Sequence, residues 1–193
     1  MLATLQRHVI EPLQAAIGCP LSAAHYHDLT DATALTTDRQ GTDIIGQQLE
    51  LEFCGGPTLC LSWYGVPGWQ TYSLAVARTS FCTAAERFVP PGDCWPRYLG
   101  RVLTGFRIFG YPRAEVSRTN LGTGHQTTDV YCYEPHLLLL NFDGVWMGVA
   151  NWHAEDDFIP RQPIGDDIWV LFDAGQISRA IAELGLEALP NEP

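Results

Sequence analysis

The side chains best suited to chemistry gather near the C-terminus, in a segment rich in carboxylates. They are His153, Glu155, Asp156, Asp157, Asp166 and Asp167. A divalent metal needs several carboxylates that converge in space, whereas neighbouring residues of a strand point to opposite faces. The alternate ligands around a central glycine that mark a calcium loop are also missing. We therefore interpret residues 153–167 as an acidic surface loop that contacts a protein partner, with no metal bound.

Two further residue types could hold a metal or attack a substrate. His25 and His27 would share one face if they lay in a strand, but no third ligand follows at a recognisable spacing. We interpret both as surface or turn histidines. None of the six cysteines forms a C-x-x-C pair, so the sequence predicts buried free thiols.

Motifs for catalysis and cofactor binding are absent from the sequence. There is no G-x-S-x-G turn to expose a nucleophilic serine. Gly55 and Gly56 are followed by Pro57 rather than by the start of a helix, so they do not form a phosphate-binding loop. Any of six cysteines might pair with any of six histidines, and nothing in the sequence selects one pair. We predict no cofactor, and the sequence favours a protein without enzymatic activity.

One aromatic residue stands out as a candidate contact. Trp69 lies in the segment 64–70, which contains two glycines and a proline and is typical of a turn. Tryptophan, tyrosine and arginine often anchor protein interfaces. We predict that Trp69 is exposed and contacts a partner.

Two segments of the chain have similar sequences, and each has the pattern of a β-hairpin. We therefore expect a β-sheet to position the candidate residues. Phe53, Gly55 and Trp63 recur 89 positions later as Phe142, Gly144 and Trp152. In each segment an alternating apolar strand leads to a glycine turn and a second strand that ends in tryptophan. The similarity arises either from duplication of one hairpin or because two separate hairpins require the same kinds of residue at the same positions.

The order of elements predicts an α+β fold, with a mainly antiparallel sheet flanked by N-terminal and C-terminal helices. We expect a single domain over residues 1–193. Residues 1–43 would be helix and loop, with residues 22–43 forming either loop alone or loop with one short helix. Residues 44–172 would form the sheet region. Residues 112–128 are polar and rich in Gly and Thr, which predicts a surface loop. Residues 173–189 would hold a helix capped by Asp173.

The charge excludes some classes of partner. The net charge is −11, and all eleven basic residues are arginine. Nucleic acids and anionic membranes require positive surface, so the sequence argues against both and favours a basic protein. The Arg-rich segment 78–118 carries seven arginines and three acids, whereas 151–193 carries two arginines and nine acids. Either these segments pair on the folded surface, or the acidic one forms a face for a partner.

The N-terminus lacks the apolar stretch of a secretory signal, and the longest aliphatic run, Leu137–Leu140, is far too short to span a bilayer. These features predict a cytoplasmic protein. The sequence does not fix its oligomeric state, although an exposed sheet edge would suit a homodimer.

In its small size, acidity and lack of catalytic motifs, the chain resembles the cytoplasmic immunity proteins that bacteria pair with toxins of interbacterial competition. That resemblance is one of general character. It implies a protein that binds a toxin and blocks its active site. The acidic residues Glu155–Asp157 and Asp166–Asp167 would then contact a basic cleft, such as that of a nuclease or deaminase.

The alternative interpretation is a small enzyme, or a ligand- or metal-binding domain. Its site would lie in the same segment between His153 and Asp167, and it would need a concave pocket with convergent polar groups.

Overall fold

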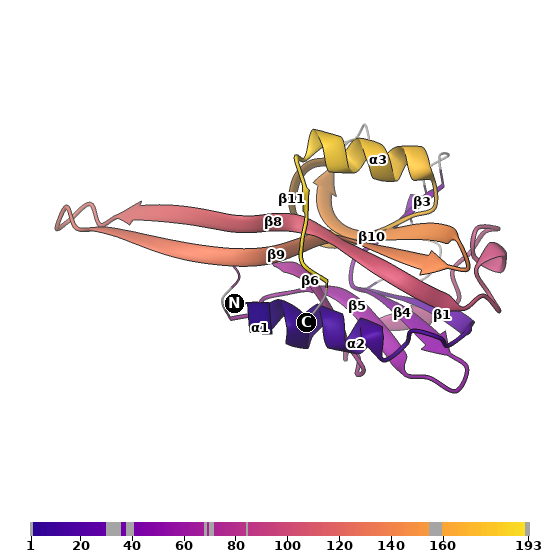
Figure 1. The fold of residues 1–193 in the computed structure, drawn as a ribbon. Helices are drawn as coiled ribbons and strands as arrows, with labels where there is room; N and C mark the ends of the chain where they lie inside the picture. Colours follow the sequence, from indigo (N-terminus) through magenta and orange to yellow (C-terminus); the bar gives the residue numbers. More distant parts are fainter. Residues whose placement is uncertain are drawn as a thin grey trace.

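Two antiparallel sheets face each other across the main hydrophobic core (Figure 1). The computed structural model describes residues 2–29, 36–37, 41–67, 69, 72–83, 85–154 and 160–191. The first sheet has the order β6-β5-β4-β1-β7, and the second has the order β12-β8-β9-β10-β11-β3-β2. Helices are few and short, so the fold is broadly α+β and mostly antiparallel β, as the sequence predicts.

The strands of the first sheet are β1 (Leu21–Asp28), β4 (Gln48–Phe53), β5 (Thr58–Tyr64), β6 (Ser73–Ala77) and β7 (Glu86–Phe88). Those of the second are β2 (Thr36–Thr37), β3 (Thr42–Ile45), β8 (Leu103–Thr119), β9 (Gln126–Phe142), β10 (Val145–Ala154), β11 (Pro160–Leu171) and β12 (Glu187–Ala188).

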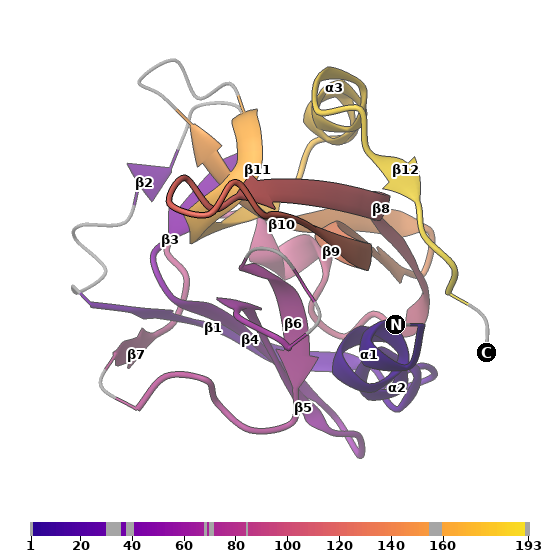
Figure 2. The same cartoon turned by 90° about the vertical axis from the view of Figure 1, so that its left-hand side faces the viewer.

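The helices cover the edges and the outside of this pair of sheets. At the N-terminus, α1 (Leu2–Leu5), the π-helical turn η1 (Gln6–Ile10) and α2 (Glu11–Gln14) run on from one another and pack against β6. The helix α3 (Ala174–Glu183) lies on the outer side of the second sheet, where a smaller apolar cluster forms (Figure 2). A short 3-10 turn, η3 (Trp95–Arg97), lies between β7 and β8. No helix within the described ranges is both long and apolar enough to cross a bilayer.

The two predicted hairpins are confirmed, and they lie in different sheets. They are β4–β5 and β9–β10, and the rings of Phe53 and Phe142 stack across the core with centroids 6.4 Å apart. The correspondence fails at the tryptophans, because Trp63 packs on the main core whereas Trp152 lies in the cluster under α3. The turn of β4–β5 is one residue longer than the turn of β9–β10. A shift of one residue places every following side chain of the strand on the opposite face of its sheet.

The predicted C-terminal helix is confirmed over Ala174–Glu183, but it is shorter than the predicted range 173–189, because Glu187–Ala188 form β12. The Asp173 carboxylate accepts a hydrogen bond from the backbone N–H of Gln176 at 3.0 Å, and Gly185 closes the helix with a φ of +59°.

Three predictions of loop are wrong. Residues 21–28 form β1, which pairs with both β4 and β7, so the sheet region begins well before residue 44. Residues 112–128 belong to the long hairpin of β8 and β9. Residues 160–167 belong to β11 rather than to a loop. In each case a partner strand supplies the backbone hydrogen bonds that a polar segment would otherwise find in water. For β1 the partners are distant in sequence, whereas the other two segments pair within their own hairpins.

Candidate functional site

The outer face of the first sheet carries a cluster of histidine, glutamate and arginine side chains that contact one another. On β4, Leu49 and Leu51 point into the core, so the residues between them point outward. Glu50 lies opposite His25 in the register of β1 and β4. His25 and His27 therefore share the outer face with Glu50, as two histidines in one strand must.

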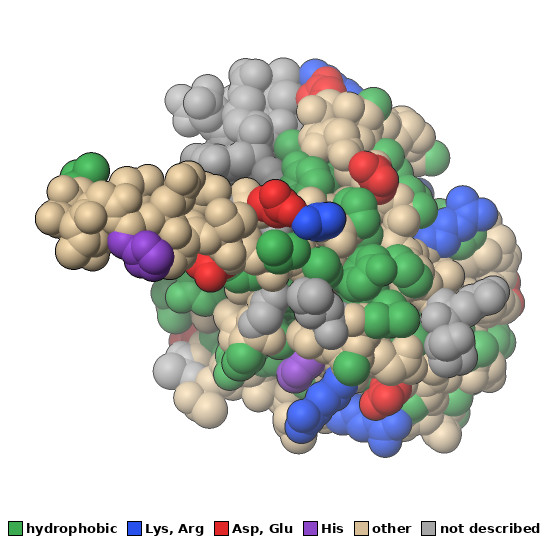
Figure 3. Space-filling view, turned by 60° about the vertical axis from the view of Figure 1, so that its left-hand side comes forward, with side chains coloured by type: hydrophobic (Ala, Val, Ile, Leu, Met, Phe, Trp, Pro, Cys, Tyr) green, Lys and Arg blue, Asp and Glu red, His purple; other side chains and the backbone are tan. Residues whose placement is uncertain are grey.

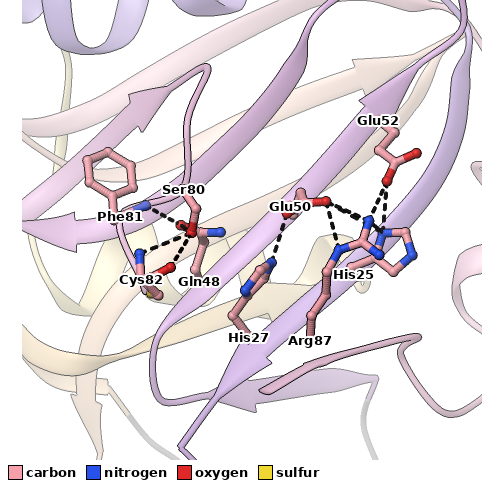
Figure 4. A network of polar contacts seen from close by, with 9 residues as sticks. All are labelled: His25, His27, Gln48, Glu50, Glu52, Ser80, Phe81, Cys82 and Arg87. Atoms are coloured by element: carbon pink, nitrogen blue, oxygen red, sulfur yellow. Dashed lines mark hydrogen bonds and ion pairs between the residues drawn. The ribbon is translucent and has the colours of Figure 1, made fainter. Parts of the chain in front are cut away.

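Arg87 of β7 completes this cluster (Figure 4). Its Nε and Nη2 donate to Glu50 Oε1 at 3.1 and 2.7 Å, and Nη2 also donates to Glu52 and, at 2.9 Å, to His25 Nδ1. His27 Nε2 donates to the second oxygen of Glu50 at 2.8 Å. Because a guanidinium has no acceptor, His25 Nδ1 must hold its lone pair toward Arg87. We call these five residues the outer-face cluster.

Burial and charge act against each other in the outer-face cluster. Burial raises the pKa of Glu50, but hydrogen bonds from Arg87 and His27 outweigh it and leave that pKa below its usual range. Burial and the charge of Arg87 lower the pKa of His25, although Glu52 and Glu50 oppose them. Glu50 is therefore ionised at neutral pH and His25 is uncharged.

The connection between β6 and β7 crosses this face, since those strands are opposite edges of the sheet. The backbone N–H of Phe81 donates to Gln48 Oε1 at 2.8 Å, and the Ser80 hydroxyl donates to the same oxygen at 3.2 Å. Gln48 is completely buried beneath these contacts, next to the outer-face cluster on the same face of the sheet (Figure 4).

The outer-face cluster holds acids, a base and a cation but lacks an activated nucleophile. Cys60 lies opposite Glu50 on β5, and burial raises the pKa of its thiol to about 12. The thiolate is the reactive form of cysteine, so Cys60 is inert at neutral pH. All six cysteines are free as predicted, but only Cys60 is fully buried, and Cys54 is exposed.

The structure corrects the prediction for Trp69. This side chain is only 7% exposed, and its ring makes an edge contact with His8 at 6.3 Å between centroids. A turn in which the N–H of Trp69 donates to the carbonyl of Val66 at 3.0 Å accompanies this burial. The expected exposure of Trp69 is therefore wrong.

The structure describes only some of the acidic residues that the sequence predicts to contact a partner. Glu155, Asp156 and Asp157 lie outside the described residues, as do the side chains of His153 and Asp166. The backbone of His153 lies in β10, where it pairs with Gln162 of β11. The neighbouring pair is Trp152 and Asp167, so Asp166 lies in a bulge of β11 between these two pairs. Asp167 itself is partly buried.

The most unusual feature of the surface is a long hairpin that projects from the body (Figure 1). Its strands pair from Tyr111 opposite Glu134 as far as Thr119 opposite Gln126. We call residues 111–134 the arm. Strand β12 pairs with β8 only at Phe109 and Gly110, and the pairing of β10 with β9 stops at Leu137. Among the described residues, both outer edges of the arm are therefore unpaired.

A β-bulge lies at the root of the arm, where β8 and β9 leave the body of the sheet. The register of β8 and β9 shifts between Phe109 and Gly110, and Tyr133 has a φ of +58°. The extra residue, His136, is 1% exposed, and its Nδ1 lies 3.2 Å from Asn151 Oδ1. A side chain at Gly110 would overlap the backbone of Glu134. Sequence reasoning missed this feature, although the Gly110-Tyr111-Pro112 sequence inside an apolar strand is a bulge signal.

Comparisons of the chain with protein families, curated proteins and solved structures found no match.

Proposed function

We propose that this protein is a non-enzymatic binding protein that neutralises a basic protein partner, as the bacterial immunity proteins neutralise toxins. The single observation that carries the proposal is the arm. A two-stranded hairpin alone is at best marginally stable in water, and unpaired strand edges invite another strand. An arm of this length fits best with a partner that covers it.

The chemistry of the arm suits a strand of another protein. Its exposed charged side chains form two ion pairs, Arg113 with Glu115 and Arg118 with Asp129, and Glu134 at its root is buried. On the face of the arm that Figure 3 shows, most of the remaining surface is neither charged nor hydrophobic. Backbone hydrogen bonds along an edge would therefore provide most of the contact.

The overall charge supports a basic partner. A net charge of −11 speeds the approach of a positive protein and repels nucleic acid. In this proposal the acidic residues Glu155, Asp156, Asp157, Asp166 and Asp167, with His153, contact the basic surface of the partner. The buried Trp69 is no longer part of the proposed interface.

The experiment is a pull-down from the lysate of the native host at low and high salt, with bound proteins identified by mass spectrometry. Three forms are compared: the wild-type protein, a short-arm variant in which Asn-Gly replaces residues 116–129, and Leu121→Ala. Leu121 is 97% exposed at the tip, so its removal leaves both strand edges intact. Circular dichroism verifies that the short-arm variant folds.

We expect one stoichiometric basic partner that binds the wild-type protein and Leu121→Ala, is released as salt rises and is lost from the short-arm variant. The purified partner should lose its toxic activity when the wild-type protein is added. Absence of a partner at both salt concentrations, or equal capture by the folded short-arm variant, would contradict the proposal.

A further inference from the structure

Three side-chain atoms of the outer-face cluster that could bind a metal lie close together around one position. His25 Nδ1 lies 3.8 Å from Glu50 Oε1 and 3.4 Å from Glu52 Oε1, and all three atoms lie within 4.8 Å of one another. Ligand atoms around a tetrahedral zinc, with bonds of about 2.0–2.1 Å, lie about 3.4 Å apart. Small side-chain rotations would therefore bring all three atoms to bonding distance of one ion.

The ligand atoms are held in advance of binding. Adjacent strands fix His25 opposite Glu50, and Glu52 follows on the same face of β4. His27 donates a hydrogen bond of 2.8 Å to the oxygen of Glu50 that faces away from this point. Outer hydrogen bonds of this kind orient ligating carboxylates in metal sites. His25 Nδ1 also holds a lone pair toward the same point, as a metal ligand must.

A cationic group already lies at that point. The Nη2 nitrogen of Arg87 is hydrogen-bonded to all three ligand atoms. One guanidinium balances one of the two carboxylates, whereas a divalent ion would balance both. The Arg87 side chain is 45% exposed and lies on the three-residue edge strand β7, so it can turn into solvent without opening the core.

We propose that His25, Glu50 and Glu52 form a binding site for a divalent transition metal of the zinc type, and that Arg87 competes with the metal for this site. The mixture of one imidazole and two carboxylates suits zinc better than calcium or magnesium, which prefer oxygen ligands alone. Water completes the coordination. This site is independent of the arm and of the proposed partner.

The test uses the full chain and Co²⁺ as a spectroscopic probe for zinc. Wild type, Arg87→Met, Glu50→Gln and Glu52→Gln are titrated with Co²⁺, and the bound ion is then displaced with Zn²⁺. Glu86→Gln serves as the matched control, because Glu86 is exposed on the same strand and, among the described residues, its side chain makes no hydrogen bond or ion pair with the cluster.

We expect Arg87→Met to bind one Co²⁺ with the visible absorption of low coordination number. Its affinity should exceed that of the wild type by about tenfold or more, since the competing cation is gone. Glu86→Gln should bind like the wild type. Both glutamate variants should lose the site, and Glu52→Gln keeps the test valid if Glu50→Gln fails to fold, because Glu52 is more exposed.

Two results would overturn the proposal. The first is that Arg87→Met shows no stoichiometric Co²⁺ binding, or no gain in affinity over the wild type. The second is that binding survives in a folded glutamate variant, which would place the ion elsewhere on this acidic chain.

Discussion

Lowering the pH from 7 to 5 should remove about 2 kcal/mol of the free energy of unfolding through one buried histidine, His136. This residue is the extra one in the bulge at the root of the arm, and it is 1% exposed. Burial lowers its pKa from 6.5 to about 4, although the hydrogen bond with Asn151 works in the opposite direction. The ring of Tyr111 packs on the imidazole with centroids 5.5 Å apart.

The sign follows from where the proton binds. Below pH 6.5 the unfolded chain takes up a proton at His136, whereas the folded protein does not until the pH approaches 4. Acid therefore favours the unfolded state, with a slope that approaches about 1.4 kcal/mol per pH unit within this window. Between pH 7 and pH 5 the integrated loss is about 2 kcal/mol, and above pH 7 the contribution no longer changes.

The assay is urea unfolding followed by tryptophan fluorescence, at steps of pH between 7.5 and 5. His136→Asn keeps a polar atom near the position of Nδ1 and removes the titration. The variant should be less stable at pH 7 because ring packing is lost, but it should lose about 2 kcal/mol less than the wild type on acidification. His125→Ala, on the exposed arm, controls for a histidine that is not buried. Parallel pH profiles for the wild type and His136→Asn would refute the reasoning.

Other measurements test local features. Asp173→Ala should lower the free energy of unfolding by about 1 kcal/mol in urea titrations, because α3 loses its N-cap. Gly110→Ala should lower it by more than about 2 kcal/mol, because the new methyl group would overlap the Glu134 carbonyl; an unchanged midpoint would contradict the bulge. In the native protein at pH 8, a thiol reagent such as iodoacetamide should label the exposed Cys54 and leave Cys60 unmodified, as peptide mass spectrometry would reveal.

Local patterns predicted the elements that depend on local physics. Apolar patterns located β4 and the part of β9 over residues 137–142, glycine located their turns, and Asp173 located the start of α3. Each signal arises from residues within a few positions of each other, so it can be read along the chain.

Segments whose structure depends on pairing with another strand were not predictable in this way. Most residues of the arm are polar, and they form two strands because each half pairs with the other across the turn at residues 120–125. β1 reads as loop, since its histidines and serine obscure the alternation, yet it lies between β4 and β7. Trp69 lies in a turn-rich segment, and its burial depends on how the N-terminal helices pack.

The sequence by itself determined the α+β class, the two hairpins and the acidic charge, because these follow from composition and from side-chain periodicity. Only the tertiary structure decided that His25, Glu50, Glu52 and Arg87 share one face of one sheet. The periodicity of apolar residues predicts which side chains of a strand point away from the core, but it does not predict which other strand lies next to that strand. That neighbour is set by backbone pairing between segments as far apart as β1 and β7, and the outer-face cluster exists only where that pairing places it.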